Sequence, residues 1–192
     1  RPAVPAVRRG GPYEHLTAAE GELLEAIVDR LIPADEHGPG GLDAGVMRYI
    51  DRALGGALAP SRAAYTAGLA ALDRYASASR GRPFLQLSNT DRDSVLIDVE
   101  TGAARGFQGS SAQFFSMVLA HTRQGMFGDP FYGGNVNFAG WDLLGYPGVR
   151  TMVSAADQKA YEAGQLPPTR RSAYDTESFH KATVRQDGAE DH

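Results

Sequence analysis

Apolar residues recur at helical spacing along much of this chain, and each run of them ends near a glycine or a proline. The first run consists of side chains that share one face of a helix: Leu23, Leu24, Ile27, Val28, Leu31 and Ile32. No segment shows the strict alternation of apolar and polar residues that a half-buried strand requires. The pattern therefore predicts an all-α fold, an irregular bundle of about five helices.

Capping signals indicate where these helices begin. Thr17 followed by Glu20 forms a capping box, in which each side chain bonds the backbone N–H of the other residue, and Pro33 ends the first helix. The residues expected to cap or begin the later helices share a short polar side chain: Asp43, Ser61, Ser88 or Thr90, and Ser111. The fifth helix, from about Ser111 to Gly125, is the most apolar, so we expect it at the centre of the bundle.

Composition limits the classes of protein to which the chain can belong. With 192 residues, 42% of them hydrophobic, it suits one globular domain. Its 19 basic and 23 acidic residues give a net charge of -4, which argues against nucleic acid as a partner. The absence of cysteine excludes disulfides and thiolate chemistry. No apolar run approaches the roughly 20 residues that a membrane-spanning helix needs.

The segment 127–148 breaks the helical pattern and is rich in glycine, proline and aromatic residues. We expect a structured loop, in which glycine and proline set the turns that aim the aromatic side chains. These side chains can cover the end of the bundle, form a recognition surface, or do both. The residues of this loop that we assign to partner binding are Phe131, Tyr132, Asn135, Trp141 and Tyr146.

The two ends of the chain lie outside the helical domain, which we place at residues 16–148. Residues 1–15 hold three prolines and are predicted to form an extended arm. Residues 149–192 contain one candidate short helix near Ala155 to Ala163, but too few apolar side chains for a core of their own. We therefore expect a C-terminal tail that wraps along the body or along a partner chain. The tail residues assigned to this contact are Arg170, Arg171, Tyr174 and Phe179.

Candidate catalytic groups form no recognised pattern in the sequence. Neither the G-x-S-x-G element of a serine hydrolase nor a glycine-rich nucleotide fingerprint is present. His121 lies on the apolar face of the fifth helix, where a histidine is usually a core residue; a general base there needs an acid such as Asp129. The stretch Asp35–His37 with Asp43 offers ligands for a divalent cation, but it matches no metal-loop spacing and favours a solvated turn. We assign no catalytic, cofactor-binding or metal-binding residue.

Several short elements together resemble the gluconate 2-dehydrogenase gamma-subunit family. They are I-P-A-D at Ile32–Asp35, A-G-V-x-x-[YF]-I-D at Ala44–Asp51, D-P-x-Y-G-G-N at Asp129–Asn135, and G-W and G-Y-P-G within 140–148. The resemblance covers most of residues 16–148 and leaves out the N-terminal arm and the tail. Any one of these elements alone is a weak signal, whereas the set is specific.

The resemblance implies a small helical accessory subunit of a flavin-dependent, membrane-associated dehydrogenase complex. Its expected partners are a large FAD-containing subunit of the glucose-methanol-choline class and a multihaem c-type cytochrome, so FAD and c-type haem belong to the partners. It also implies a periplasmic location at the inner membrane through the complex, and a twin-arginine leader on the precursor. Arg8-Arg9 lacks the apolar region that follows the arginines of such a leader. No catalytic residue is carried over.

The sequence thus predicts a non-catalytic subunit that stabilises or escorts a gluconate-type sugar or sugar-acid dehydrogenase. Two alternatives stay open at this stage. One is a metal-assisted hydrolase that uses Asp35, His37 and His121, and the other is a free-standing helical domain that binds a small ligand.

Overall fold

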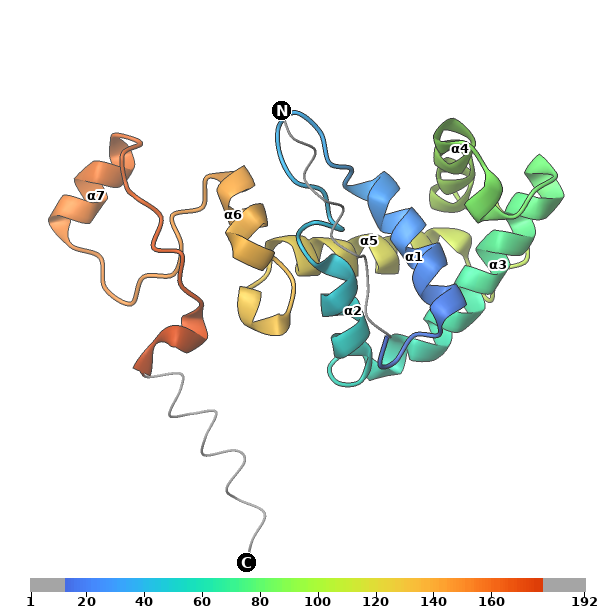
Figure 1. Ribbon diagram of the computed structural model, residues 1–192, viewed down its shortest axis with the longest axis horizontal. Coiled ribbons are helices and arrows are strands. Elements are labelled where there is room, and N and C mark those ends of the chain that lie inside the picture. The colour runs from blue at the N-terminus through green and yellow to red at the C-terminus, as the bar shows by residue number, and fades with distance from the viewer. Residues whose placement is uncertain (1–12, 178–192) are drawn as a thin grey trace, which may run out of the picture.

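Helix α5 (Ser111–Phe127) runs through the middle of the molecule, and helices α1 to α4 and α6 pack against it (Figure 1). The structure is a computed structural model that describes residues 13–177. Within this range the protein is all-α, without a β-strand. The expectation of an α-helical bundle with the fifth helix at its centre is therefore confirmed for the described residues.

Residues 13–177 contain seven α-helices and five short 3-10 helices. The α-helices other than α5 are α1 (Ala18–Leu31), α2 (Val46–Leu54), α3 (Arg62–Arg80), α4 (Asn89–Glu100), α6 (Ala139–Leu144) and α7 (Ala155–Glu162). The 3-10 helices are η1 (Ala59–Ser61), η2 (Phe84–Gln86), η3 (Pro130–Tyr132), η4 (Val136–Phe138) and η5 (Ala173–Asp175). The buried core lies among α1 to α5, with Leu24, Ile50, Tyr65, Leu72 and Val95 among its fully covered side chains.

Two of the predicted helix caps are confirmed, and a third is wrong. The Thr17 capping box is present, and the side chain of Ser88, rather than that of Thr90, caps α4. Asp43 does not cap α2, because its carboxylate accepts the N–H of Gly40 at 3.1 Å and closes the preceding turn. Helix α2 instead begins after Gly45, whose φ of 76° lies in the left-handed region that glycine tolerates.

The segment 127–148 is ordered as predicted, but it is more helical than its sequence indicates. It contains η3, η4 and the six-residue helix α6. Six residues are fewer than two helical turns, so α6 cannot show a recognisable apolar period. Its position is set by tertiary contacts with α5.

A partly buried ionic network joins α1 to α3. The Glu20 carboxylate accepts hydrogen bonds from both terminal nitrogens of Arg62 at 3.0 and 2.7 Å. It also accepts from the Thr66 hydroxyl at 2.7 Å and from the Thr17 backbone N–H at 2.8 Å. Burial alone raises the pKa of the Glu20 carboxyl, but these hydrogen bonds outweigh it and bring the pKa from 4.5 to about 2.

Replacing Glu20 by Gln is therefore expected to cost about 2 kcal/mol of stability at neutral pH. Because the folded-state pKa is lower than the ordinary value, the contribution of Glu20 is complete above pH 4.5 and declines as the pH falls towards 2. Urea denaturation of both proteins at pH 7 and pH 3 measures this difference. A difference between the proteins that stays constant over this range would show that the network contributes nothing as an ion pair.

Candidate functional site

Exposed apolar side chains gather at the end of the molecule formed by 127–148 and the following residues. Eleven large hydrophobic residues are exposed within residues 13–177, and nine of them lie between positions 131 and 161. They are Phe131, Tyr132, Val136, Leu143, Leu144, Tyr146, Met152, Val153 and Tyr161. Single exposed apolar residues are common on soluble proteins, whereas such a concentration marks an interaction surface.

Asn135 organises the backbone beneath this surface. Its side chain is fully buried, donates to the carbonyl of Gly128 at 2.8 Å and accepts the N–H of Gly140 at 2.8 Å. Its own backbone N–H donates to the carbonyl of Gly125 at the end of α5. We assigned Asn135 to partner binding from the sequence, but its side chain does not reach the surface in this structure, so its role is to hold the loop.

Two glycines allow the loop to lie directly on the backbone of α5. A Cβ atom at Gly134 would stand 2.1 Å from the carbonyl oxygen of Gly125. A Cβ atom at Gly140 would stand 1.9 Å from the carbonyl oxygen of Met126. Real Cβ atoms do not approach backbone oxygens so closely, so only glycine permits this contact.

Trp141 is the apolar anchor of α6. Its indole N–H donates to the carbonyl of Phe127 at 2.9 Å, and its ring packs against the rings of Phe138 and Tyr146. The side chain is buried, so Trp141 supports the surface from below rather than presenting itself to a partner. Tyr146, which packs edge-on against it, is exposed.

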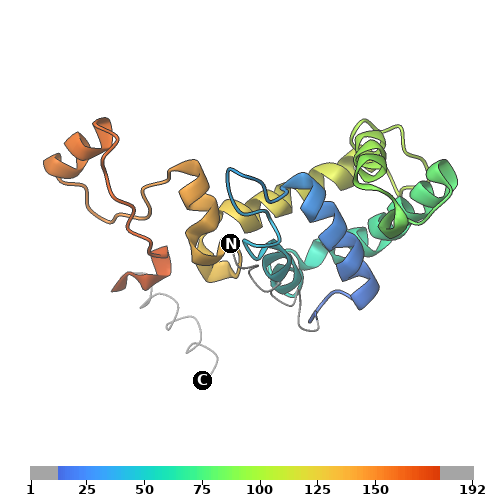
Figure 2. The same ribbon diagram turned by 45° about the horizontal axis from the view of Figure 1, so that its top comes forward.

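Asp129 connects this loop to the C-terminal tail. Its carboxylate accepts the backbone N–H of Phe131 at 2.9 Å within the loop. From the tail it accepts the hydroxyl of Ser172 at 2.6 Å and the backbone N–H of Ala173 at 2.8 Å. The tail from 170 to 175 thus docks on the same end of the molecule as the aromatic loop (Figure 2).

Three aromatic rings close this junction. Phe131 stacks on Tyr174 with ring centroids 3.9 Å apart, and Tyr132 meets both rings edge-on. The hydroxyl groups of Tyr132 and Tyr174 share a hydrogen bond, which together with burial raises the pKa of Tyr132 to about 12. Tyr132 therefore stays neutral at physiological pH and presents an uncharged ring.

The remaining tail residues that we assigned from sequence lie in different settings. Arg170 donates to the carboxylate of Asp142 on α6 at 2.8 Å, and its φ of 46° marks a sharp bend. Arg171 is exposed. Phe179 lies outside the described residues.

The residues considered for hydrolytic chemistry are engaged elsewhere. His121 is buried, and its Nδ1 lies 3.1 Å from the Tyr65 hydroxyl, while burial lowers the pKa of this histidine. Asp35 accepts the backbone N–H groups of His37 and Gly38, which makes this stretch a solvated turn. Among residues 13–177, no group of three or more potential ligands is placed to hold a metal ion.

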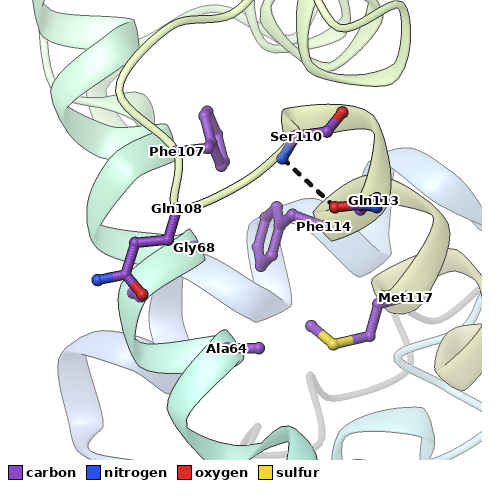
Figure 3. Close-up of a pocket in the computed structure, with 9 residues that line it drawn as sticks. Ala64, Gly68, Phe107, Gln108, Ser110, Gln113, Phe114 and Met117 are labelled. Atoms are coloured by element: carbon purple, nitrogen blue, oxygen red, sulfur yellow. Dashed lines mark hydrogen bonds between the residues drawn. The ribbon is translucent and has the colours of Figure 1, made fainter.

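A small apolar hollow lies between α3 and the start of α5, at the other end of the bundle (Figure 3). Its volume is about 210 Å³, and the rings of Phe107 and Phe114 border it together with Ala64 and Met117. The ring of Phe114 rests directly on Gly68, where a Cβ atom would stand only 2.1 Å from it. Small-molecule sites usually exceed about 300 Å³, so this hollow is better explained by helix packing.

A comparison with protein families identifies the body of the chain. A model of the gluconate 2-dehydrogenase subunit 3 family matches residues 18–148, which is more than half of the sequence. The chain belongs to this family. Gluconate 2-dehydrogenase subunit 3 is one subunit of a dehydrogenase complex, and the resemblance inferred from the short sequence elements is therefore confirmed. Neither the curated proteins nor the solved structures gave a match.

Three polar residues of the short sequence elements accept hydrogen bonds from the backbone. Asp51, Asp129 and Asn135 stand at the ends of these elements, and each accepts backbone N–H groups from a distant or neighbouring segment. Asp51 receives three of them, from Glu14 and the two residues that follow it. These three polar residues therefore hold backbone segments in place in this chain.

Sequence reasoning missed part of the exposed surface of this family member. Leu143 and Leu144 are neighbours on α6, and Met152 and Val153 are neighbours just before α7; all four are exposed. The segment shows no helical period, so no signal in the sequence distinguished these exposed side chains from buried ones. None of the helices between residues 13 and 177 has the length and apolar character that a membrane crossing requires.

Proposed function

We propose that this chain is the non-catalytic small (gamma) subunit of a periplasmic, membrane-associated, FAD-dependent sugar or sugar-acid dehydrogenase complex of the gluconate type. Its role is to stabilise or escort the large flavoprotein subunit. FAD resides in that subunit and c-type haem in a cytochrome subunit, while this chain reaches the membrane only through the complex. Membership of the gluconate 2-dehydrogenase subunit 3 family supports the proposal.

The observation that carries the proposal is the gathering of nine exposed apolar side chains within residues 131–161. The backbone beneath most of them is fixed by hydrogen bonds of Asn135, Trp141 and Asp129 that are buried or partly buried. An apolar surface on a fixed backbone loses little conformational freedom when a partner binds. The surface is thus suited to a stable protein interface.

Through such an interface, this chain can stabilise the flavoprotein without taking part in catalysis. A subunit that binds only the folded flavoprotein shifts the folding equilibrium of that protein by mass action. Within the surface, the exposed aromatic residues Phe131, Tyr132 and Tyr146 are the proposed contacts, with Arg171 available for carboxylates of the partner. Trp141 and Asn135 act through the shape of the loop.

Co-expression with the large flavoprotein subunit from the same source tests this function. We expect the two proteins to co-elute on size exclusion with FAD absorbance, and the yield of FAD-loaded flavoprotein to fall several-fold when this chain is omitted. Leu144→Ser on α6 is expected to weaken association about tenfold, whereas Ile97→Ser, at a similarly exposed position on α4, leaves it unchanged. A flavoprotein that loads FAD equally well alone and never co-elutes with this chain contradicts the proposal.

A further inference from the structure

Residues 147–169 form a finger that leaves the helical body and returns to it. Its neck is closed by hydrogen bonds from the Thr169 backbone N–H to the Pro147 carbonyl at 3.0 Å and from the Thr169 hydroxyl to the Val149 carbonyl at 3.2 Å. Arg150 adds a bond to the carbonyl of Pro167. Helix α7 forms the tip of the finger and stands beyond α6, away from α1 to α5 (Figures 1 and 2).

Both ends of α7 are capped by hydrogen bonds within the finger. Ser154 and Asp157 form a capping box at its start, and the Gln165 backbone N–H donates to the Ala160 carbonyl after its end, next to Gly164 in the left-handed region. Yet none of the eight residues of α7 is buried. Isolated helices of this length are marginal in water, so their stability normally comes from burial of one face.

Three exposed apolar side chains are available for such burial, two just before α7 and one near its end. Met152 is 85% exposed, Val153 67% and Tyr161 64%. The charges of the finger balance, because it contains two basic and two acidic residues. Arg150 lies 3.6 Å from Asp157 and so is occupied within the finger.

We propose that the finger is an anchor whose tip inserts into an uncharged, apolar groove on the large flavoprotein subunit. This inference rests on the proposed function and adds a specific element to it. All but the first two residues of the finger lie beyond residue 148, where the family match ends, so the finger extends the matched helical body. Its apolar tip projects from the same end of the molecule that carries the exposed Leu144 and Tyr146, so one partner can contact both (Figure 1).

The charge of the finger favours a protein groove over a lipid surface. Segments that bind anionic membranes carry an excess of lysine and arginine beside their apolar residues. Here Lys159 is the basic residue of α7, with Asp157 and Glu162 on the same helix. A second copy of this chain would have to offer a matching apolar groove, whereas the hollow between α3 and α5 is only about 210 Å³.

The test compares a finger variant with a matched control in the complex with the large subunit. The finger variant carries Met152→Ser, Val153→Ser and Tyr161→Ser, and the control carries Leu85→Ser and Ile97→Ser, which are exposed on η2 and α4. We expect the dissociation constant to rise about 100-fold for the finger variant and less than about threefold for the control. Hydrogen exchange is expected to show that amides of 152–165 become protected when the wild-type complex forms.

The three side chains replaced in the finger variant are exposed in the free chain, so the thermal midpoint of the variant should match that of the wild type. An unchanged dissociation constant together with unprotected amides in 152–165 overturns the anchor but leaves the proposed function standing. The same holds if the variant loses binding to phosphatidylglycerol–phosphatidylethanolamine vesicles, or loses self-association, while its affinity for the flavoprotein is retained. If the wild-type chain forms no complex at all, the proposed function fails and the anchor fails with it.

Discussion

Replacing Gly140 by Ala is expected to destabilise the protein by about 4 kcal/mol and to abolish partner binding through the 127–148 surface. The added methyl group would stand 1.9 Å from the carbonyl oxygen of Met126, and this oxygen belongs to the backbone of α5 and cannot swing aside. Helix α6 must therefore move away from α5. The movement breaks the hydrogen bonds of Gly140 to Asn135 and of Trp141 to Phe127. Urea denaturation and titration against the flavoprotein measure the two effects.

Gly56→Ala is the matched control for this substitution. The nearest atom to a Cβ at Gly56 is the Ala53 carbonyl oxygen at 3.9 Å, which is an ordinary contact. We expect a change of less than about 0.5 kcal/mol and no effect on association. If Gly140→Ala is as mild as Gly56→Ala, then α6 does not rest on the α5 backbone as the structure shows.

Replacing Asp51 by Ala is expected to cost about 3 kcal/mol. One oxygen of this buried carboxylate accepts the backbone N–H groups of His15 and Leu16 at 3.0 and 2.9 Å, and the other accepts that of Glu14 at 2.8 Å. The substitution leaves these donors without a partner and frees the segment that leads into α1. Chemical denaturation measures the loss, and hydrogen exchange should show faster exchange at residues 14–16.

Two further substitutions separate the charge of Asp51 from its geometry. Asp51→Asn retains one acceptor oxygen but turns an NH₂ group towards a backbone N–H, so we expect a loss of about 1 to 2 kcal/mol. Asp35→Ala removes an exposed carboxylate that accepts two backbone N–H groups, and it should cost less than about 1 kcal/mol. Equal losses at Asp35 and Asp51 would mean that burial of the Asp51 bonds has no energetic consequence.

These substitutions act on the scaffold, whereas Leu144→Ser and the finger variant act on exposed side chains. The contrast matters because the proposed function depends on a surface whose shape is set before binding. Loss of association through Gly140→Ala should be accompanied by loss of stability. Loss of association through Leu144→Ser should leave stability unchanged, since that side chain is exposed. Measuring both quantities for each variant separates the support of the surface from the contact itself.

The sequence was sufficient where short-range interactions decide the structure. The Thr17 capping box, the Ser88 cap and the helix near Ala155 each depend on residues within a few positions, and all three are present. The prediction failed at Asp43, whose carboxylate accepts the N–H of Gly40 and closes the turn before α2; a distant segment also contacts this turn. The Val136 backbone N–H donates to the Ala44 carbonyl at 3.0 Å, and α2 begins only after that turn.

In the candidate site, too, the sequence was sufficient for short-range features but not for those that depend on distant contacts. Composition and turn residues indicated that 127–148 carries an aromatic surface, but not which of its residues are exposed. Tyr132 and Tyr146 face solvent, whereas Trp141 and Asn135 are buried, and no local pattern distinguishes the two pairs. Exposure there depends on the contact of Gly140 with α5, which joins residues that are separated in the sequence.

By itself, the sequence determined helices α1 to α5 and α7, their caps in most cases, and the family to which residues 18–148 belong. These features follow from helical periodicity and from hydrogen bonds between near neighbours, which a sequence displays directly. Only the tertiary structure decided that the tail docks on Asp129 and that the finger carries its apolar residues in solvent. The physical reason is that burial and pairing across tens of residues depend on how the helices meet in space.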